Sequence, residues 1–196
     1  MICSATSNTC ASSAHSVNDI LIRDLNIDCI INILTDCCKG LIKCLSLRNC
    51  SRETVQNEAL IAVILGQTVF NHPDENVNVT ANIEQLGKTF MSILVNGIYA
   101  VQKKAQRENY EPQVTVTLSQ EGGKAKVVIH DNGIGIESTI IDKIFDPFFT
   151  TKTTGEAAGV GLYLSKEIVQ NHKGDITVRS EKDVYTEFTI TLPTTT

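Results

Sequence analysis

Asn96 is the first residue whose surroundings suggest chemistry, because it lies on the apolar stripe of a segment with helical spacing. Ser92 stands one helical turn before it and Lys103 two turns after it, near the same face. The amide of an asparagine on such a face needs hydrogen-bond partners, and its carbonyl oxygen suits a hard cation such as Mg²⁺. Asn96 is therefore a candidate cation ligand, and a capping or packing role is the alternative.

Asp131, Gly133 and Gly135 form a second candidate site, directly after an alternating segment that ends at His130. A carboxylate at a strand end can accept a hydrogen bond from an amino group, and alternate glycines let a flat ligand approach the bare backbone. Ser138 stands where a dinucleotide-binding fingerprint would have its third glycine, so that fingerprint is disfavoured. An exposed aspartate in a turn is the alternative interpretation.

Three of the six phenylalanines lie in the segment 144–152, which reads Ile-Phe-Asp-Pro-Phe-Phe-Thr-Thr-Lys. Pro147 excludes a regular helix there. We expect Phe145, Phe148 and Phe149 to anchor the start of a loop, and the small polar residues that follow to make residues 150–158 mobile.

Glycines also open the last helical segment, in the run Gly159, Val160, Gly161 and Leu162. The first turn of a helix presents backbone N–H groups and the positive end of the dipole to an anion, and glycines keep side chains out of the way. The chain has no Gly-x-x-x-x-Gly-Lys-Ser/Thr run, so this segment is not a P-loop.

Hydrophobic periodicity predicts the elements that position these residues. Residues 83–105 and 161–171 have helical spacing, and Gly174 is expected to end the second helix in the C′ position. Period-two alternation predicts hairpins over residues 114–129 and 176–192. Together these elements predict an α+β fold, a two-layer sandwich with a mixed, mostly antiparallel sheet and helices on one face.

The N-terminal part of the chain divides into three predicted segments. Residues 1–18 form a flexible polar tail, residues 19–50 are helical because apolar residues recur at spacings of three and four, and residues 51–196 form the main domain. That domain is expected to begin with a strand over 59–65, a turn over 71–74 and a strand around Val77 and Val79. All seven cysteines lie within the first 50 residues and show no Cys-x-x-Cys spacing, which favours apolar packing over disulfides or zinc.

Composition and charge narrow the function further. Apolar residues make up 42% of the chain and charged residues 20%, which is typical of a soluble globular domain. The longest apolar run, residues 59–65, is too short to span a bilayer, and no signal peptide is evident, so a cytoplasmic location is expected. A formal net charge of −5 argues against nucleic acid as a partner.

The order and spacing of the four motifs resemble those of the ATP-binding catalytic domain of sensor histidine kinases, which belongs to the Bergerat-fold ATPases. Asn96 matches the N box, residues 131–135 the first glycine box, residues 144–152 the F box and residues 159–162 the second glycine box. The F box is diagnostic because gyrase-like relatives lack it. The resemblance covers residues 77–193 and implies a histidine kinase-like ATPase fold.

The resemblance implies a site for ATP and Mg²⁺. Asp131 would accept a hydrogen bond from the adenine amino group, Asn96 would hold Mg²⁺ against the phosphates, and residues 150–158 would form a lid. Asn96 and Lys152 are the implied catalytic residues. The other implied ATP-binding residues are Gly133, Gly135, Phe145, Thr150, Thr151, Gly159, Val160, Gly161 and Leu162. Four positions depart from the family pattern and bear on the rate of transfer: Ser92, Gly97, Ala157 and Ala158.

None of His15, His72, His130 and His172 has the acidic residue and nearby proline that follow the family's phosphoacceptor histidine. The sequence therefore predicts a protein-histidine kinase domain that passes the γ-phosphate of ATP to a histidine not evident in this chain. Residues 20–47 would be either a remnant of the dimerising helices or a helix that covers the sheet. The implied partners are a histidine-containing dimerisation or phosphotransfer domain and a response regulator.

Two other functions stay open at this point. One is an anti-sigma-type protein-serine kinase, which shares the fold, although the F box counts against it. The other is a nucleotide-binding module without catalysis.

Overall fold

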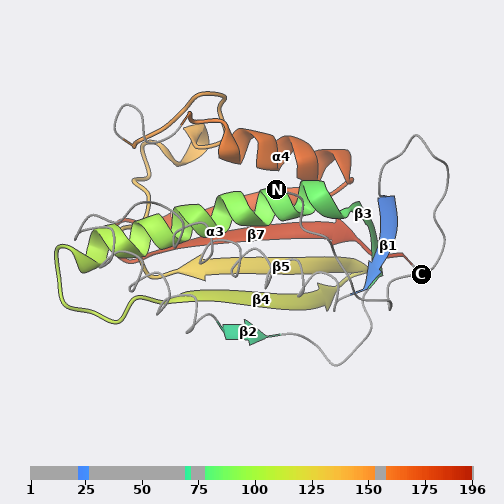
Figure 1. The fold of residues 1–196 in the computed structure, drawn as a ribbon, viewed down its shortest axis with the longest axis horizontal. Helices are drawn as coiled ribbons and strands as arrows, with labels where there is room; N and C mark the ends of the chain where they lie inside the picture. The colour runs from blue at the N-terminus through green and yellow to red at the C-terminus, as the bar shows by residue number, and fades with distance from the viewer. Residues whose placement is uncertain (1–21, 27–68, 72–77, 153–157, 196) are drawn as a thin grey trace, which may run out of the picture.

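The computed structural model describes residues 22–26, 69–71, 78–152 and 158–195. One layer is a five-stranded sheet and the other consists of helices α3 (Ile83–Ala105) and α4 (Gly161–Asn171) (Figure 1). The strand order is β2 (Val69–Asn71), β4 (Val114–Glu121), β5 (Lys124–Asp131), β7 (Tyr185–Pro193) and β6 (Asp175–Glu181), antiparallel except for β2 beside β4. A short 3-10 helix, η1 (Ile141–Lys143), lies between β5 and α4. The predicted α+β sandwich and both predicted hairpins are confirmed.

One face of the sheet carries the core. Buried residues alternate with less buried ones along β4, β5 and β7. Because the strands pair in register, the buried residues line up in rows across the sheet and pack against the helices. Two of these rows are Val116–Ile129–Phe188 and Leu118–Val127–Ile190.

Helix α3 covers this face, and its predicted span of residues 83–105 is confirmed. The helix begins after Asn82, whose Oδ1 accepts a hydrogen bond from the N–H of Gln85 at 3.0 Å. Its fully buried apolar residues recur at spacings of three, four and seven: Leu86, Phe90, Ile93, Leu94 and Val101. Although α3 has 23 residues, neither it nor another helix in the described part of the chain is long and apolar enough to cross a membrane.

The predicted span of helix α4, residues 161–171, is confirmed, but its C′ residue is not Gly174. The C′ residue is Lys173, which adopts a left-handed conformation with φ of 58°, and Gly174 follows it. The N–H of Gly174 donates to the Val169 carbonyl and that of Lys173 to the Gln170 carbonyl, which together make a Schellman motif. Gly174 is needed for packing instead, since a Cβ atom there would lie 2.3 Å from the Thr191 carbonyl oxygen in β7.

His172 joins the end of α4 to the start of α3. Its Nδ1 lies 2.7 Å from the Ile168 carbonyl oxygen, and its Nε2 accepts the N–H of Asn82 at 2.9 Å. These two contacts require a neutral ring that carries its proton on Nδ1. One side chain thereby satisfies backbone groups at the ends of both helices.

The helical prediction for residues 19–50 is wrong at Ile22–Asn26, which form strand β1. This strand pairs antiparallel with β3 (Asn78–Asn82) in a separate two-stranded sheet, from Ile22 opposite Asn82 to Asn26 opposite Asn78. Five residues are too few for apolar spacing to distinguish a helix from a strand, so a neighbouring strand with backbone groups to pair decides the conformation. The rest of the predicted helical segment lies outside the described residues, as does the tail over 1–18.

Strand β3 confirms the alternation predicted around Val79, whose side chain is buried together with that of Ala81. Strand β2 was not predicted, and Asn71, which we assigned to a turn, ends it. Three residues are too short a run for a period-two signal, and β2 exists through parallel pairing with β4, where Phe70 lies opposite Val116. The predicted strand over 59–65 and the remainder of the turn lie outside the described residues.

The His172 contacts predict a measurable loss of stability. His172→Ala should lower the free energy of unfolding by about 1–2 kcal/mol, because the Asn82 N–H loses its acceptor in a part-buried position. Gln170→Ala, at an exposed position of the same helix, is the matched control and should change it by less than about 0.5 kcal/mol. Urea unfolding of the three proteins tests this, and equal midpoints for the two variants would contradict it.

Candidate nucleotide-binding site

Asp131 places a carboxylate in the core at the end of β5. The residue is 4% exposed and lies beside Gly97 of α3, where a Cβ atom would be 3.4 Å from Asp131 Oδ2. Its Oδ1 accepts the N–H of Gly133 at 3.0 Å. Burial raises the pKa of Asp131 to about 7, although the Gly133 hydrogen bond and the positive charge of Lys104 act in the opposite direction. An acceptor that titrates near neutral pH therefore lies beneath α3.

The loop after Asp131 is held between α3 and the turn that joins β6 to β7. A Cβ atom at Gly133 would lie 2.5 Å from the carbonyl carbon of Ala100, so the missing side chain lets the loop backbone lie against the helix. Gly135 has φ of 61° and lies against the backbone of Glu181. Both glycines thus have packing roles, which the sequence interpretation did not include.

Asn96 presents its side-chain carbonyl oxygen to a cation. Lys152 Nζ donates to Asn96 Oδ1 at 2.9 Å and also lies 4.5 Å from the centre of the Tyr99 ring, one turn further along α3. Asn96 is half-buried. The two residues predicted to be catalytic are therefore in direct contact, and the oxygen assigned to a cation faces an ammonium group.

The aromatic segment is anchored by two of its phenylalanines. Phe145 packs edge-to-face with Phe188 of β7 at 6.3 Å between ring centres, and Phe149 packs against the core. The expectation for Phe148 is wrong, since its side chain is 76% exposed and its φ of 66° is left-handed. Gly159 lies directly against this residue, because a Cβ atom there would be 2.5 Å from the Phe148 carbonyl carbon. The residues that flank the predicted lid are therefore in contact. Residues 153–157, on which the expected mobility of the lid depends, lie outside the described residues.

The second glycine segment forms the first turn of α4, as predicted. Val160 is the N-cap. Its side chain has no acceptor, so it does not bind the backbone N–H groups of the first turn. Gly161 lies against α3, where a Cβ atom would be 2.6 Å from Ser92 Oγ. Leu162 packs against the core. Thr150 accepts the N–H of Lys152 through its hydroxyl oxygen, and Thr151 is exposed.

All four predicted motifs meet along one face of α3. Asn96 of the N box belongs to the helix itself, and the other three motifs reach this face through close contacts with it, the first glycine box at two positions. The contacts are Ser92 with Gly161, Asn96 with Lys152, Gly97 with Asp131, and Ala100 with Gly133.

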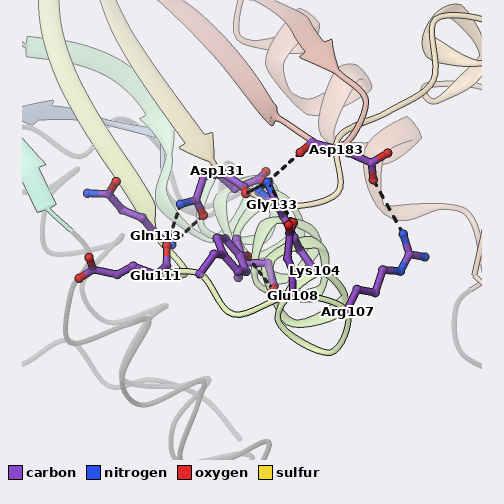
Figure 2. A network of polar contacts seen from close by, with 11 residues as sticks. Lys104, Arg107, Glu108, Glu111, Gln113, Asp131, Gly133 and Asp183 are labelled. Atoms are coloured by element: carbon purple, nitrogen blue, oxygen red, sulfur yellow. Dashed lines mark hydrogen bonds and ion pairs between the residues drawn. The ribbon is translucent and has the colours of Figure 1, made fainter.

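Lys104 and Asn132 hold the loop beside the candidate site, and the sequence reasoning missed both. Figure 2 shows Lys104 reaching from α3 to the loop beside Asp131 and Gly133. Its ammonium donates to the Asn132 carbonyl at 3.3 Å and to the Asp183 carbonyl at 2.7 Å. The Asn132 side chain accepts from the Gln113 N–H. The sequence signal for Lys104 was a basic residue in the last turn of a helix, which indicates only that it complements the dipole.

The buried carboxylate of Asp131 should make stability depend on pH. The pKa of an unfolded aspartate is about 4, and that of Asp131 in the folded protein is about 7. Between these values the folded protein binds the extra proton, so the free energy of unfolding falls as the pH rises from about 4 to about 7. Asp131→Asn cannot ionise and escapes this loss.

We expect the stability of Asp131→Asn relative to the unmodified protein to rise by on the order of 3 kcal/mol between pH 4.5 and pH 8. Urea unfolding at the two pH values measures it. Asp142→Asn, at an exposed position in η1, is the control and should show no comparable change. A stability difference that is the same at both pH values would contradict the assignment of a raised pKa to Asp131.

The sequence matches a family model and several sensor kinases. Residues 81–196 match the family model of the histidine kinase-, DNA gyrase B-, and HSP90-like ATPases. The chain is 36% identical to the signal transduction histidine-protein kinase AtoS of Escherichia coli over 115 residues, which is 59% of this chain and 18% of AtoS. It is 30% identical to the sensor histidine kinase ZraS of Escherichia coli O157:H7 over 148 residues, which is 76% of this chain and 30% of ZraS. The chain thus spans less than a third of the length of these relatives.

Solved structures show the same fold. A mycobacterial sensor histidine kinase, MprB, superposes with a TM-score of 0.62 at 19% identity over 89% of this chain and 98% of that one. The nucleotide-free catalytic domain of histidine kinase ThkA gives a TM-score of 0.63 at 19% identity over 89% of this chain and all of that one. The chain therefore belongs to the histidine kinase-, DNA gyrase B-, and HSP90-like ATPase family and contains an ATP-binding catalytic domain of the sensor histidine kinase type.

Proposed function

We propose that this chain binds ATP with Mg²⁺ and transfers the γ-phosphate to a histidine on a separate domain or protein. The observation that carries the proposal is the convergence on α3, which brings a buried carboxylate, an amide oxygen facing a cation and a helix N-terminus to one face of the helix. The carboxylate can accept a hydrogen bond from a nucleotide base, and the amide oxygen can ligate a metal ion that is bound to phosphate. The N–H groups of the helix N-terminus can donate to a phosphate oxygen.

Asp131 would recognise adenine. The amino group of adenine is a donor and guanine has a carbonyl oxygen at the same position, so an ionised carboxylate favours adenine. The Gly133 N–H occupies Oδ1, so Oδ2 would be the oxygen that accepts from the base.

The phosphates would lie between the first turn of α4 and Lys152. The N–H groups of the turn and the ammonium of Lys152 offset the phosphate charge in a chain whose formal net charge is −5.

The residues present fit Mg²⁺. Asn96 Oδ1 already faces a cation, and the described residues contain no cluster of three His, Cys, Asp or Glu side chains that could hold a metal alone. Mg²⁺ typically takes one or two protein oxygens and completes its shell with phosphates and water. Asn96 would hold it, and when bound it would neutralise charge on the phosphate oxygens.

The acceptor would be an imidazole in its neutral form. Its unprotonated nitrogen attacks the γ-phosphorus, an N–P bond forms as the bond to the bridging oxygen of ADP breaks, and ADP leaves with the electron pair. The ring then releases its remaining N–H proton to a base.

The two described histidines, His130 and His172, both make side-chain contacts within the domain. Both ring nitrogens of His172 lie in hydrogen bonds, and the His130 ring stacks on Tyr185. His15 and His72 lie outside the described residues. We propose that the acceptor lies on a histidine-bearing dimerisation or phosphotransfer domain in the cytoplasm, where ATP is available, with a response regulator as the next acceptor.

Asp131→Asn should remove adenine recognition. The Gly133 N–H keeps the amide oxygen at the Oδ1 position, so the amide nitrogen meets the adenine amino group, donor against donor. We expect ATP affinity to fall by at least about tenfold with loss of the preference for ATP over GTP. In the unmodified protein, ATP affinity should fall about tenfold from pH 8 to pH 6, because Asp131 with a pKa of about 7 becomes protonated.

Calorimetric titration with ATP and GTP at both pH values tests this pair of expectations. Glu137→Gln, an exposed carboxylate paired with Lys182, is the control and should behave like the unmodified protein. Equal ATP affinity in Asp131→Asn would remove Asp131 from the site.

Phosphoryl transfer should require the second domain. Alone, the chain should bind ATP without labelling itself, since alignment of donor and acceptor supplies about 7–11 kcal/mol of the barrier. With radiolabelled ATP and a histidine-bearing dimerisation domain from the same system, we expect an acid-labile, alkali-stable label on that domain. Asn96→Ala should abolish the transfer and make nucleotide affinity insensitive to Mg²⁺.

Three results would contradict this reaction. An acid-stable label on serine or threonine would favour the serine-kinase alternative, and binding without any transfer would favour the non-catalytic module. Self-labelling that is lost in His15→Ala would place the acceptor in this chain.

A further inference from the structure

Lys104 is a largely buried cation on α3. Its side chain is 15% exposed, and its ammonium lies 5.0 Å from the centre of the Tyr110 ring and 3.8 Å from a Glu108 carboxylate oxygen. The two carbonyls that it binds belong to Asn132, directly after Asp131, and to Asp183, in the turn between β6 and β7. A lysine needed only to complement the helix dipole would remain in solvent, so burial of this ammonium calls for another explanation.

The contacts of Lys104 close a ring of hydrogen bonds around the loop that follows Asp131. The Ile134 N–H donates to the Ala100 carbonyl at 3.3 Å, and the Asp183 N–H donates to the Ile134 carbonyl at 2.8 Å. Lys104 binds both the first residue of this loop and the turn that supports it (Figure 2). Loss of its ammonium would leave two carbonyls without their charged donor.

Few charged groups face Asp131 from the elements packed around it. Its partners in the sheet are Val114 of β4 and Thr186 of β7, which carry no charge. From the connection after α3 comes Tyr110, whose hydroxyl donates to a backbone carbonyl and whose pKa is raised to about 12 by burial and by the Asp131 charge. From α3 comes Lys104, whose positive charge lowers the pKa of Asp131 against the effect of burial.

We propose that Lys104 is a positioning residue that acts through Asp131: its ammonium holds the loop after β5 and supplies the positive charge that keeps the buried carboxylate ionised for base recognition. The role of Asp131 toward the base rests on the proposed function, whereas the coupling between Lys104 and Asp131 does not. Lys104 itself need not touch the nucleotide.

The test measures the ionisation of Asp131 with and without Lys104. The carboxyl ¹³C resonance of Asp131, assigned by its absence in Asp131→Asn, is followed against pH in nucleotide-free protein. Lys104→Met removes the charge and keeps an apolar stem, and Lys104→Gln removes the charge and keeps a neutral donor. Lys104→Arg preserves the charge. Lys103→Met is the matched control, because that neighbouring ammonium lies over Tyr99 at 5.3 Å instead.

We expect the pH midpoint of Asp131 to rise by about one pH unit in Lys104→Met and Lys104→Gln, and to stay in place in Lys104→Arg and Lys103→Met. ATP affinity at pH 7 should then fall about fivefold in the first two variants and recover toward that of the unmodified protein at pH 9. This recovery distinguishes control of charge from simple support of the loop.

An unchanged midpoint in both neutral variants would overturn the proposal, and so would a loss of affinity of equal size at every pH. A midpoint that rises as expected in a chain that binds no nucleotide would support the coupling and overturn the proposed function instead. Lys104→Gln keeps the test decisive if Lys104→Met does not fold.

Discussion

Close approach of other backbones to α3 is the constraint on which the site depends. The loop after β5 and the first turn of α4 come within contact distance of this helix at positions where one or both partners lack a large side chain. At Gly133 the available space is already filled by the backbone of Ala100. Because backbone atoms cannot rotate aside, a larger residue at such a contact would move the whole loop and its carboxylate away from the helix.

The buried carboxylate of Asp131 is unfavourable for folding, although the proposed binding depends on it. The core beneath α3 is apolar apart from a few residues, and Asp131 is the one described residue in it that carries an ionisable group. Burying a carboxylate opposes folding, and a chain selected for stability alone would place an apolar residue there. The surrounding donors, Gly133 N–H and Lys104, reduce this cost without removing it, which is typical of groups retained for function.

Long elements with a clear period were predictable from the sequence, and short ones were not. The span of α3 and the two hairpins follow from many residues that repeat one spacing. Strands β1 and β2 exist through pairing with β3 and β4, which no local pattern encodes in five or three residues. Likewise the motif residues were identifiable by type, but the outward side chain of Phe148 and the burial of Lys104 depend on backbone conformation and tertiary contacts.

The two ends of α4 are held very differently. Its C-terminal end is held by the Schellman motif and by His172, while its N-terminal end has a valine cap and two nearby glycines. Fraying by heat would therefore start at the glycine end, and an anion bound there would order the least stable turn of the helix. A substitution at the histidine end would therefore act mainly on stability, whereas one at either glycine would also disturb the contacts with α3 and with Phe148 next to the bound anion.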